Sequence, residues 1–587
     1  MSIFEQVKNF FMSKFQNQTE DVKQTGSVVF PAEYLLAVDI LNDYMENWKP
    51  EVEKLEGHTH FKFVEVQNQL LQLIEDNPGI LSIQNNNDRN IGMYAADCKF
   101  TEVVKKSLMD KKASLQQDEM GYNIGMCCVM NNLDECVEIA LDNYEAATQQ
   151  NHNGFNMAIL LSGGRNEKLI IKALENHEAC MQQTTQSKLT AGMNCAKRLL
   201  KNATLKALED KEASMLVDIK LKTIASYCVE TGFEEGVLKA LDNKELSKIK
   251  DFSGRNLGMQ AAHNGMSKAT LKALQDDELS IDVDNYGSNL GLNAIDGGVD
   301  EDVIIEALKN PVACLQQNDL GWNMGMACVI FRKERAALEA AKNEGIITQQ
   351  SDEQRKNMGM YAAEYKMESV FMKIIENETA ATQVDSSGRN MGMRAAIRGF
   401  EEGVIKALDN PIASTQQDSI GFNIGMYAAE REMPRATLKA VENKEALLQK
   451  SHPESRELTI ALLAAQKGYK EAALKAAKIK KVREYKDKIG NDIFDYGQYS
   501  GVKEYLKKHK KEIYHPEEFE NDSVNELNQQ EQKENKSSDE ITNIFNPCVD
   551  IEIYNEDCET IYESEKSSQS SVVDSIDDTD ETVYDIN

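Results

Sequence analysis

The sequence contains no run of 18 or more apolar residues, so no segment of it is expected to span a membrane. Its first residues, MSIFEQVKNFF, lack the charged start, long apolar stretch and small-residue cleavage site of a secretory signal. The 11 cysteines include no C-x-x-C pair. This scatter predicts reduced, mostly buried thiols and a cytoplasmic protein.

Motifs of catalysis and cofactor binding are also missing. There is no P-loop, no H-E-x-x-H, no G-x-S-x-G and no strand–G-x-G-x-x-G–helix. His58 and His60 have no further ligands spaced nearby, which favours a surface role over a metal site. Cys127 and Cys128 are expected to pack in the core, because no base is placed beside them. We therefore expect no enzyme, no cofactor and no metal, with a catalytic site in residues 1–80 or in an unusual repeat as the alternative.

Basic residues are in a minority. The chain has 66 Lys and Arg against 97 Asp and Glu, a net charge of −31, which disfavours binding to nucleic acid or anionic lipid. Residues 515–587 hold 22 acidic side chains and 3 Lys, a net of −19, and lose all apolar periodicity. They are predicted to form a disordered acidic tail. Residues 1–514 carry only −12, so the exclusion of nucleic acid is weaker there.

A repeat dominates the rest of the sequence. The phrase Asn-x-Gly-Met and its variants occur 13 times, with a mean period of 33.5 residues. A period in this range is typical of a solenoid. The copies begin at Asn90, Asn123, Asn156, Thr190, Thr223, Asn256, Asn289, Asn323, Asn357, Asn390, Asn423, Thr459 and Asp492.

Each position of the phrase has a physical interpretation. Asn, Thr and Asp are N-cap residues, so a first helix should begin at each copy. Gly follows two residues later in nine copies, although it costs a helix about 0.5–1 kcal/mol relative to Ala. This predicts a close approach of neighbouring backbones. A second helix such as EEGVIKALDN should end at its Asn, before a linker. A Gly two residues before the cap predicts a turn with an unusual backbone angle, at Gly121, Gly154, Gly254, Gly321, Gly388 and Gly421.

Two short helices, a turn of the form D-x-x-G-x-(T/N), Ala-Ala in the first helix and Val/Leu in the second resemble the ankyrin repeat. The copy at 487–506 is the most similar, whereas N-x-G-M replaces the family's T-P-L-H elsewhere. The resemblance implies an all-α, helix-turn-helix solenoid of about 13 repeats of 33–34 residues over 80–510. A helical cap region at 1–79 would precede it and the tail at 515–587 would follow. Another helix-hairpin solenoid is the alternative.

An apolar helical face is expected near the N-terminus. It should dock as a cap on the solenoid, with an amphipathic membrane anchor as the alternative. A longer helix is predicted across 31–48. The apolar face comprises Ile3, Phe4, Val7, Phe10, Phe11 and Phe15.

The resemblance also implies where a partner would bind. In ankyrin-like arrays the residue after Met faces the concave surface, and in this chain that residue varies. Tyrosine there offers a large contact area at low entropic cost, although it could equally complete the packing between helices. We predict a protein–protein interaction scaffold whose partner-binding residues include Tyr94, Tyr227, Tyr361, Arg394 and Tyr427.

The acidic tail contains three similar tyrosine motifs, each with an aliphatic residue before Tyr and acidic residues around it. They resemble Tyr-kinase substrates and SH2 ligands, and the E-x-I-Y motifs of bacterial effectors. Phosphorylation would add about −1.5 to −2 charges per site. The alternative function is therefore a bacterial effector that is translocated into a host cell and recruits SH2 proteins or Tyr kinases. The motifs lie at Tyr554, Tyr562 and Tyr584.

Overall fold

A computed structural model describes residues 31–44 and 60–514, apart from residue 165, and these residues belong to a unit that ends at Tyr514. Within these ranges the chain is helical, and its only β-structure is two isolated bridges. The predicted all-α repeat solenoid is confirmed, since a helix begins after each of the 13 cap residues. The predicted acidic tail and its tyrosines lie outside the described residues.

Each repeat contains three helices. The first helices are α5 Ile91–Asp97, α8 Ile124–Met130, α11 Met157–Ser162, α14 Ala191–Lys197, α17 Ile224–Glu230, α20 Leu257–His263, α23 Leu290–Asp296, α25 Met324–Ile330, α28 Met358–Glu364, α31 Met391–Ile397, α34 Ile424–Glu430, α37 Ile460–Lys467 and α40 Ile493–Tyr496. The second helices are α6 Thr101–Met109, α9 Asp134–Leu141, α12 Glu167–Ala173, α15 Lys201–Ala207, α18 Glu234–Ala240, α21 Ser267–Ala273, α24 Glu301–Ala307, α26 Glu334–Ala340, α29 Glu368–Ile374, α32 Glu401–Ala407, α35 Pro434–Ala440, α38 Lys470–Ala477 and α41 Val502–Lys508. The third helices are α7 Lys111–Leu115, α10 Tyr144–Thr148, α13 His177–Met181, α16 Lys211–Ser214, α19 Lys244–Lys248, α22 Asp277–Ile281, η4 Ala313–Leu315, α27 Glu344–Thr348, α30 Glu378–Thr382, α33 Pro411–Thr415, α36 Lys444–Leu448, α39 Lys480–Arg483 and α42 Lys510–Tyr514.

The third helix corrects the prediction of two helices and a linker. The Asn or Asp that was expected to stop the second helix also starts the third. At Asn410, for example, the side chain accepts hydrogen bonds from the backbone N–H groups of Ile412 and Ala413. Pro411 occupies the first position of α33, where its missing N–H costs nothing.

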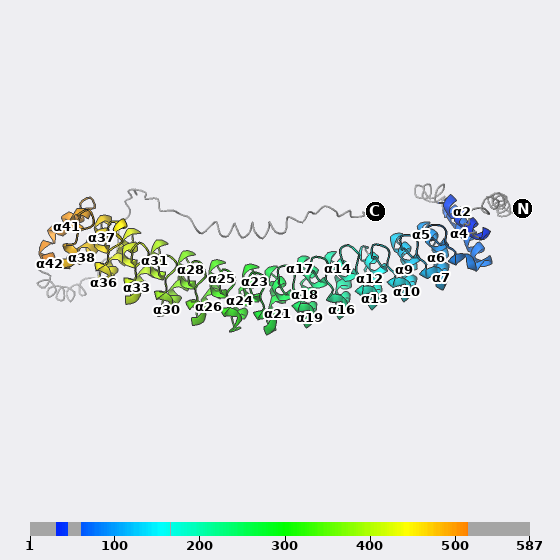
Figure 1. Ribbon diagram of the computed structural model, residues 1–587, viewed down its shortest axis with the longest axis horizontal. Helices are drawn as coiled ribbons and strands as arrows, with labels where there is room; N and C mark the ends of the chain where they lie inside the picture. Colours follow the sequence, from blue (N-terminus) through cyan, green and yellow to red (C-terminus); the bar gives the residue numbers. More distant parts are fainter. Residues whose placement is uncertain (1–30, 45–59, 165, 515–587) are drawn as a thin grey trace, which may run out of the picture. The chain divides into compact units, whose positions relative to one another are not determined.

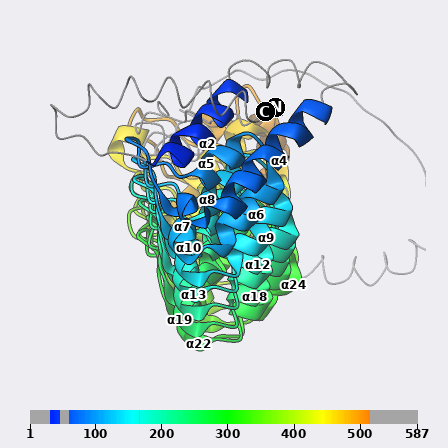
Figure 2. The same cartoon turned by 90° about the vertical axis from the view of Figure 1, so that its right-hand side faces the viewer.

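The three kinds of helix form three columns. First helices pack on first helices and second helices on second helices, in chain order along the row (Figure 1). Seen from the end, the second helices lie on one side and the third helices on the other (Figure 2). The turns that lead into the first helices border the third-helix column. The first helices from α5 to α37 are consequently buried on nearly all sides, whereas α40, in the last repeat, is more exposed.

The Gly of the repeated phrase receives a side chain from the next repeat. A Cβ at Gly392 would lie 2.5 Å from Cδ1 of Ile424 and 2.7 Å from Cβ of Ala407. At Gly359 it would lie 2.5 Å from Sδ of Met391. The predicted close approach of backbones is therefore wrong at this position, because the neighbour is the first helical side chain of the following repeat.

Backbones do meet closely at one helix end. Gly297 caps the C-terminus of α23, and a Cβ there would lie 2.1 Å from the carbonyl oxygen of Ala262 in α20. Gly163 also caps a first helix, α11, one residue earlier in the repeat, and only its own helix lies nearby. Gly297 thus has a packing role that Gly163 lacks.

The cap residue Asn does more than start a helix. Oδ1 of Asn423 accepts from the N–H of Met426 at 2.9 Å. Its Nδ2 donates to the carbonyl of Ala446 at 3.0 Å and to Oε1 of Gln449 at 2.8 Å. Gln449 in turn donates to the carbonyl of Thr415 in the preceding repeat. One buried amide therefore ties the first helix to the third helix and, through Gln, to the neighbouring repeat.

Repeats whose cap residue is Thr, which has no amide, also lack the Gln that pairs with Asn. Thr can accept from the helix but has no N–H₂ group to donate. The residue 26 positions after each Thr cap is correspondingly not Gln: it is Leu216, Ile249 or Tyr485. The Asn–Gln tie is thus interrupted in the repeats that begin at Thr190 and Thr223 and again at Thr459.

Several second helices, among them α15, α21, α26 and α35, are capped by the repeat before them. Second helices follow residues such as Phe400 and Met433, whose side chains make no capping hydrogen bond. Instead, Oε1 of Glu401 accepts from the N–H groups of Arg435 at 2.9 Å and Ala436 at 3.1 Å. Glu234 serves α21 in the same way. A carboxylate at a helix N-terminus also complements the helix dipole.

Among residues 31–44 and 60–89, two α-helices lie before the first repeat. α2 Ala32–Asp43 packs on α5, and α4 His60–Asp76 packs on α6, with η3 Pro78–Ser82 following. The ring of Phe63 lies 4.8 Å from that of Phe100, and Tyr44 lies at the same distance from Phe100. α2 falls within the helix predicted across 31–48. The apolar face predicted at residues 3–15 lies outside the described residues.

Candidate partner-binding surfaces

The residues predicted to bind a partner are mostly buried. The hydroxyl of Tyr227 donates to Oδ2 of Asp218 at 2.7 Å, and Tyr427 makes the same bond to Asp418. Both rings are less than a tenth exposed. Burial, followed by the hydrogen bond to Asp418, raises the pKa of Tyr427. These two tyrosines join the first helix to the turn before it.

Tyr94 and Tyr361 are held in similar ways. Asn85 donates to the hydroxyl of Tyr94 at 2.7 Å. Trp322 Nε1 donates to the hydroxyl of Tyr361 at 3.2 Å, and Ser351 Oγ lies 3.3 Å away. Packing thus accounts for all four tyrosines. A binding role stays a prediction for which they offer little exposed surface.

Arg394 belongs to an ion network. Its Nη1 lies 2.8 Å from Oε1 of Glu364, and its Nε donates to Oδ2 of Asp385 at 2.6 Å. Lys356 Nζ also contacts Glu364, at 2.9 Å. Both carboxylates are almost fully buried, so the two cations stabilise charges that would otherwise be costly. The guanidinium is therefore occupied within the array.

The cysteines of the described residues are buried and none is in a disulfide. Burial raises the pKa of Cys127 to about 12, and that of Cys195 likewise. Thiols with such pKa values hold almost no thiolate at neutral pH. In the described part of the chain, no group of three His, Cys, Asp or Glu side chains is placed to hold a metal ion. The helices at 31–44 and 60–514 also include none that is both long and apolar enough to cross a bilayer.

The turns form a regular row. In each, an Asp or its equivalent folds the turn: Oδ1 of Asp284 accepts from the N–H groups of Tyr286 and Ser288, both at 2.9 Å. Each Gly named above as a turn residue has a positive φ, as predicted. Successive turns are joined by backbone hydrogen bonds, such as that from the N–H of Asn285 to the carbonyl of Ser253.

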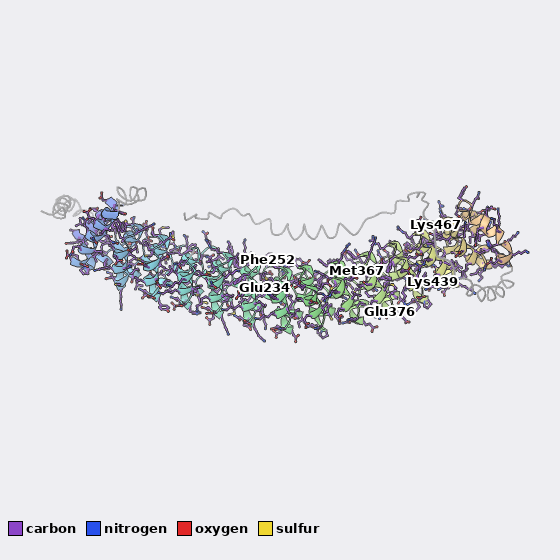
Figure 3. The ribbon with its side chains drawn as sticks, turned by 180° about the vertical axis from the view of Figure 1, so that it is seen from behind. Glu234, Phe252, Met367, Glu376, Lys439 and Lys467 are labelled. Atoms are coloured by element: carbon purple, nitrogen blue, oxygen red, sulfur yellow. The ribbon has the colours of Figure 1, made fainter. Side chains whose placement is uncertain are left out.

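Four consecutive turns expose large apolar side chains. Phe252 is 74% exposed, Ile219 65% and Tyr286 48%. Phe252 is labelled in Figure 3, near the middle of the row. Elsewhere the apolar turn residues occur singly, as at Met120, Ile420 and Ile489. We call the contiguous set the turn strip: Ile219, Leu221, Phe252, Val283, Tyr286 and Leu320.

Sequence reasoning missed the turn strip. Its signal is present: the two residues after the turn Asp are polar in many copies, but read Ile-Lys, Phe-Ser and Asn-Tyr at Asp218, Asp251 and Asp284. In many copies two Gln residues, as at 416–417, stand directly before the turn Asp. In this stretch they are replaced by Leu-Val at 216–217, Ile-Lys at 249–250 and Asp-Val at 282–283. Three of the four turns of the strip therefore lack the Gln pair, and the fourth, with Leu320, keeps it as Gln316 and Gln317.

No family model matches the chain, and no curated protein matches it. Among solved structures, it is similar to a chain in the complex of a predatory endopeptidase from Bdellovibrio bacteriovorus with its immunity protein. The match has a TM-score of 0.28 and 15% identity, and covers 33% of this chain and 98% of that chain. At this TM-score the similarity carries no argument about fold or function.

Proposed function

We propose that the array is a non-enzymatic scaffold that binds a protein partner at the turn strip. The observation that carries the proposal is the exposure of six apolar side chains in and beside four consecutive turns. Contiguous exposed apolar patches that are larger than those of an ordinary monomer surface mark interaction sites. A row of stacked repeats presents such a patch on an extended surface rather than in a pocket.

The proposal moves the predicted site from the first helices to the turns. The hydroxyls of Tyr227 and Tyr427 donate hydrogen bonds to buried Asp side chains within the array. The side chains of Phe252 and Tyr286, in contrast, are largely exposed to solvent. Aromatic residues are enriched among the residues that dominate binding energy. Phe252 and Tyr286 are therefore expected to be the main contacts.

Capture from lysate of the native cell tests this function. The full chain, the double variant Phe252→Ser with Tyr286→Ser, and the control Ile412→Ser are each immobilised, and the bound proteins are quantified. Ile412 is 62% exposed on α33, so the control removes a similar apolar group elsewhere. A protein that the wild type and the control retain, and the double variant loses, is the expected result. Equal retention by all three would refute the turn strip as the site.

A second proposal rests on the tail motifs at Tyr554, Tyr562 and Tyr584. We propose that they are phosphorylated by host Tyr kinases and recruit SH2 proteins, as expected of a translocated bacterial effector. Incubation of the full chain with a Src-family kinase, followed by mass spectrometry, tests the first step. Unmodified tail peptides would remove its basis. Membership of the ankyrin family likewise stays a prediction.

A further inference from the structure

The partner of the turn strip can be described by its geometry. We propose that it is an amphipathic α-helix with an apolar residue at every seventh position, lying along the row of turns. This rests on the proposed scaffold function and adds the class of partner.

The spacing of the turns favours a helix. Each turn leads directly into a first helix, and packed helices lie about 8–10 Å apart. The exposed turn residues Ile219, Phe252, Tyr286 and Leu320 should therefore recur at about that step, with an offset of one turn residue between Phe252 and Tyr286. Seven residues of an α-helix rise about 10.5 Å, so residues i and i+7 meet successive tips from one face. Three steps span about 24–30 Å, the length of a helix of about 16–20 residues.

An extended strand fits less well. Side chains of a strand alternate between faces, so residues three apart, at about 10 Å, point in opposite directions. Addition of a strand also requires unpaired main-chain groups. In the turns these groups are used between repeats: Asp319 N–H donates to the carbonyl of Tyr286, and Asp352 N–H to that of Leu320.

A polyproline helix is the closest competitor, since its turn rises about 9.3 Å. Grooves that bind it are lined by aromatic residues. The turn strip is mainly aliphatic, because only Phe252 and Tyr286 of its six residues are aromatic. Aliphatic side chains are the usual partners of a helical apolar seam, so the composition favours the α-helix.

Charges at the two ends complement a helix dipole. Lys220 lies beside Ile219 at one end, and Asp319 lies beside Leu320 at the other. Both are exposed, and neither makes an ion pair with another described residue. The negative C-terminus of a bound helix should thus lie near Lys220 and its positive N-terminus near Asp319.

Selection from a displayed library of random 20-residue peptides on the immobilised full chain tests the inference. We expect enriched peptides with apolar residues at i, i+3 or i+4, and i+7, which gain helical circular dichroism on binding. Their affinity should fall at least about tenfold for Phe252→Ser with Tyr286→Ser, and stay unchanged for Ile412→Ser. The swap Lys220→Glu with Asp319→Lys should weaken binding by a factor of about two to five or more.

The outcomes separate this inference from the scaffold function. Enrichment of proline-rich or alternating sequences, or no enrichment at all, would overturn the helical partner. So would helical peptides whose binding survives the Phe252 and Tyr286 substitutions. If lysate capture still depends on Phe252 and Tyr286, the scaffold function stands without the helix. If lysate capture is also unchanged by the Phe252 and Tyr286 substitutions, both the helical partner and the scaffold function at the turn strip are refuted.

Discussion

The hydroxyl of Tyr427 donates a hydrogen bond of 2.6 Å to Oδ2 of Asp418, nine residues earlier. Oδ1 of the same carboxylate accepts from the N–H groups of Ile420 and Phe422 in the turn. A single carboxylate therefore fixes the turn and attaches it to the first helix. Tyr227 with Asp218 repeats the arrangement. Where Tyr is absent the same contact is made differently, as by Asn293 with Asp284.

Loss of this bond should loosen one repeat. Tyr427→Phe leaves a lone pair of the buried Asp418 without its donor, which should cost about 1–3 kcal/mol. Hydrogen exchange of the α34 amides is the suitable measurement, because long repeat arrays do not unfold as one unit. Tyr499→Phe is the control, since Tyr499 is 96% exposed. Equal exchange in both variants would contradict the proposed role of Asp418.

Alkaline pH should loosen the last repeat. Burial, then the hydrogen bond to Asp487, raises the pKa of Tyr496 from 10.0 to about 12. Because the pKa is higher in the folded state, protonated Tyr496 stabilises the last repeat fully below pH 10. This stabilisation is lost as the pH rises toward 12. Hydrogen exchange in α40, followed with tyrosinate absorbance, should show this loss. Tyr496→Phe should remove that pH dependence, and its persistence would assign the loosening to other groups.

The repeat, its helix caps and its turns could be predicted from the sequence because each depends on interactions between residues close together in the chain. Asn, Thr and Asp cap helices by their own side chains, and Gly at a positive φ marks a turn within a few residues. The third helix was missed because a single Asn can end one helix and begin the next, as Asn410 does. Burial of Tyr94 and Tyr361 depends on neighbouring elements, which one sequence does not display.

Close contact at Gly297 should make it intolerant of a side chain. Gly297→Ala places Cβ against the carbonyl of Ala262, and the overpacking should cost about 1–3 kcal/mol. Gly163→Ala, at the C-cap of α11, should be neutral or stabilising, since only its own helix is near. Urea unfolding and hydrogen exchange of α20 and α23 measure the difference. Similar behaviour of the two variants would contradict the close approach of the helix ends.

Capping by the preceding repeat should show in a matched pair of glutamates. Glu401→Ala removes the acceptor for two N–H groups of α35 and should cost about 1 kcal/mol. Glu402→Ala removes only an exposed ion pair with Arg435 and should have a smaller effect. Exchange rates of the first α35 amides separate the two. An equal or larger effect of Glu402→Ala would refute the capping role of Glu401.

The turn strip was missed for a related reason. Apolar residues at Ile219, Phe252 and Tyr286 are each unremarkable within their own repeat. Their significance comes from the stacking, which places residues 33 or 34 positions apart on adjacent turns. Comparison of the two residues that follow the turn Asp or its equivalent, taken together across all 13 copies, would have displayed the run.

Crosslinking mass spectrometry of the full chain in its native cell tests the central claim most directly. Lys188 and Lys220 lie in turns at one end of the turn strip, whereas Lys309 and Lys342 follow second helices. The scaffold account predicts that crosslinks to other proteins concentrate at Lys188 and Lys220, and fall when Phe252 and Tyr286 are replaced by Ser. Crosslinks that concentrate at Lys309 and Lys342, unchanged by those substitutions, would contradict it.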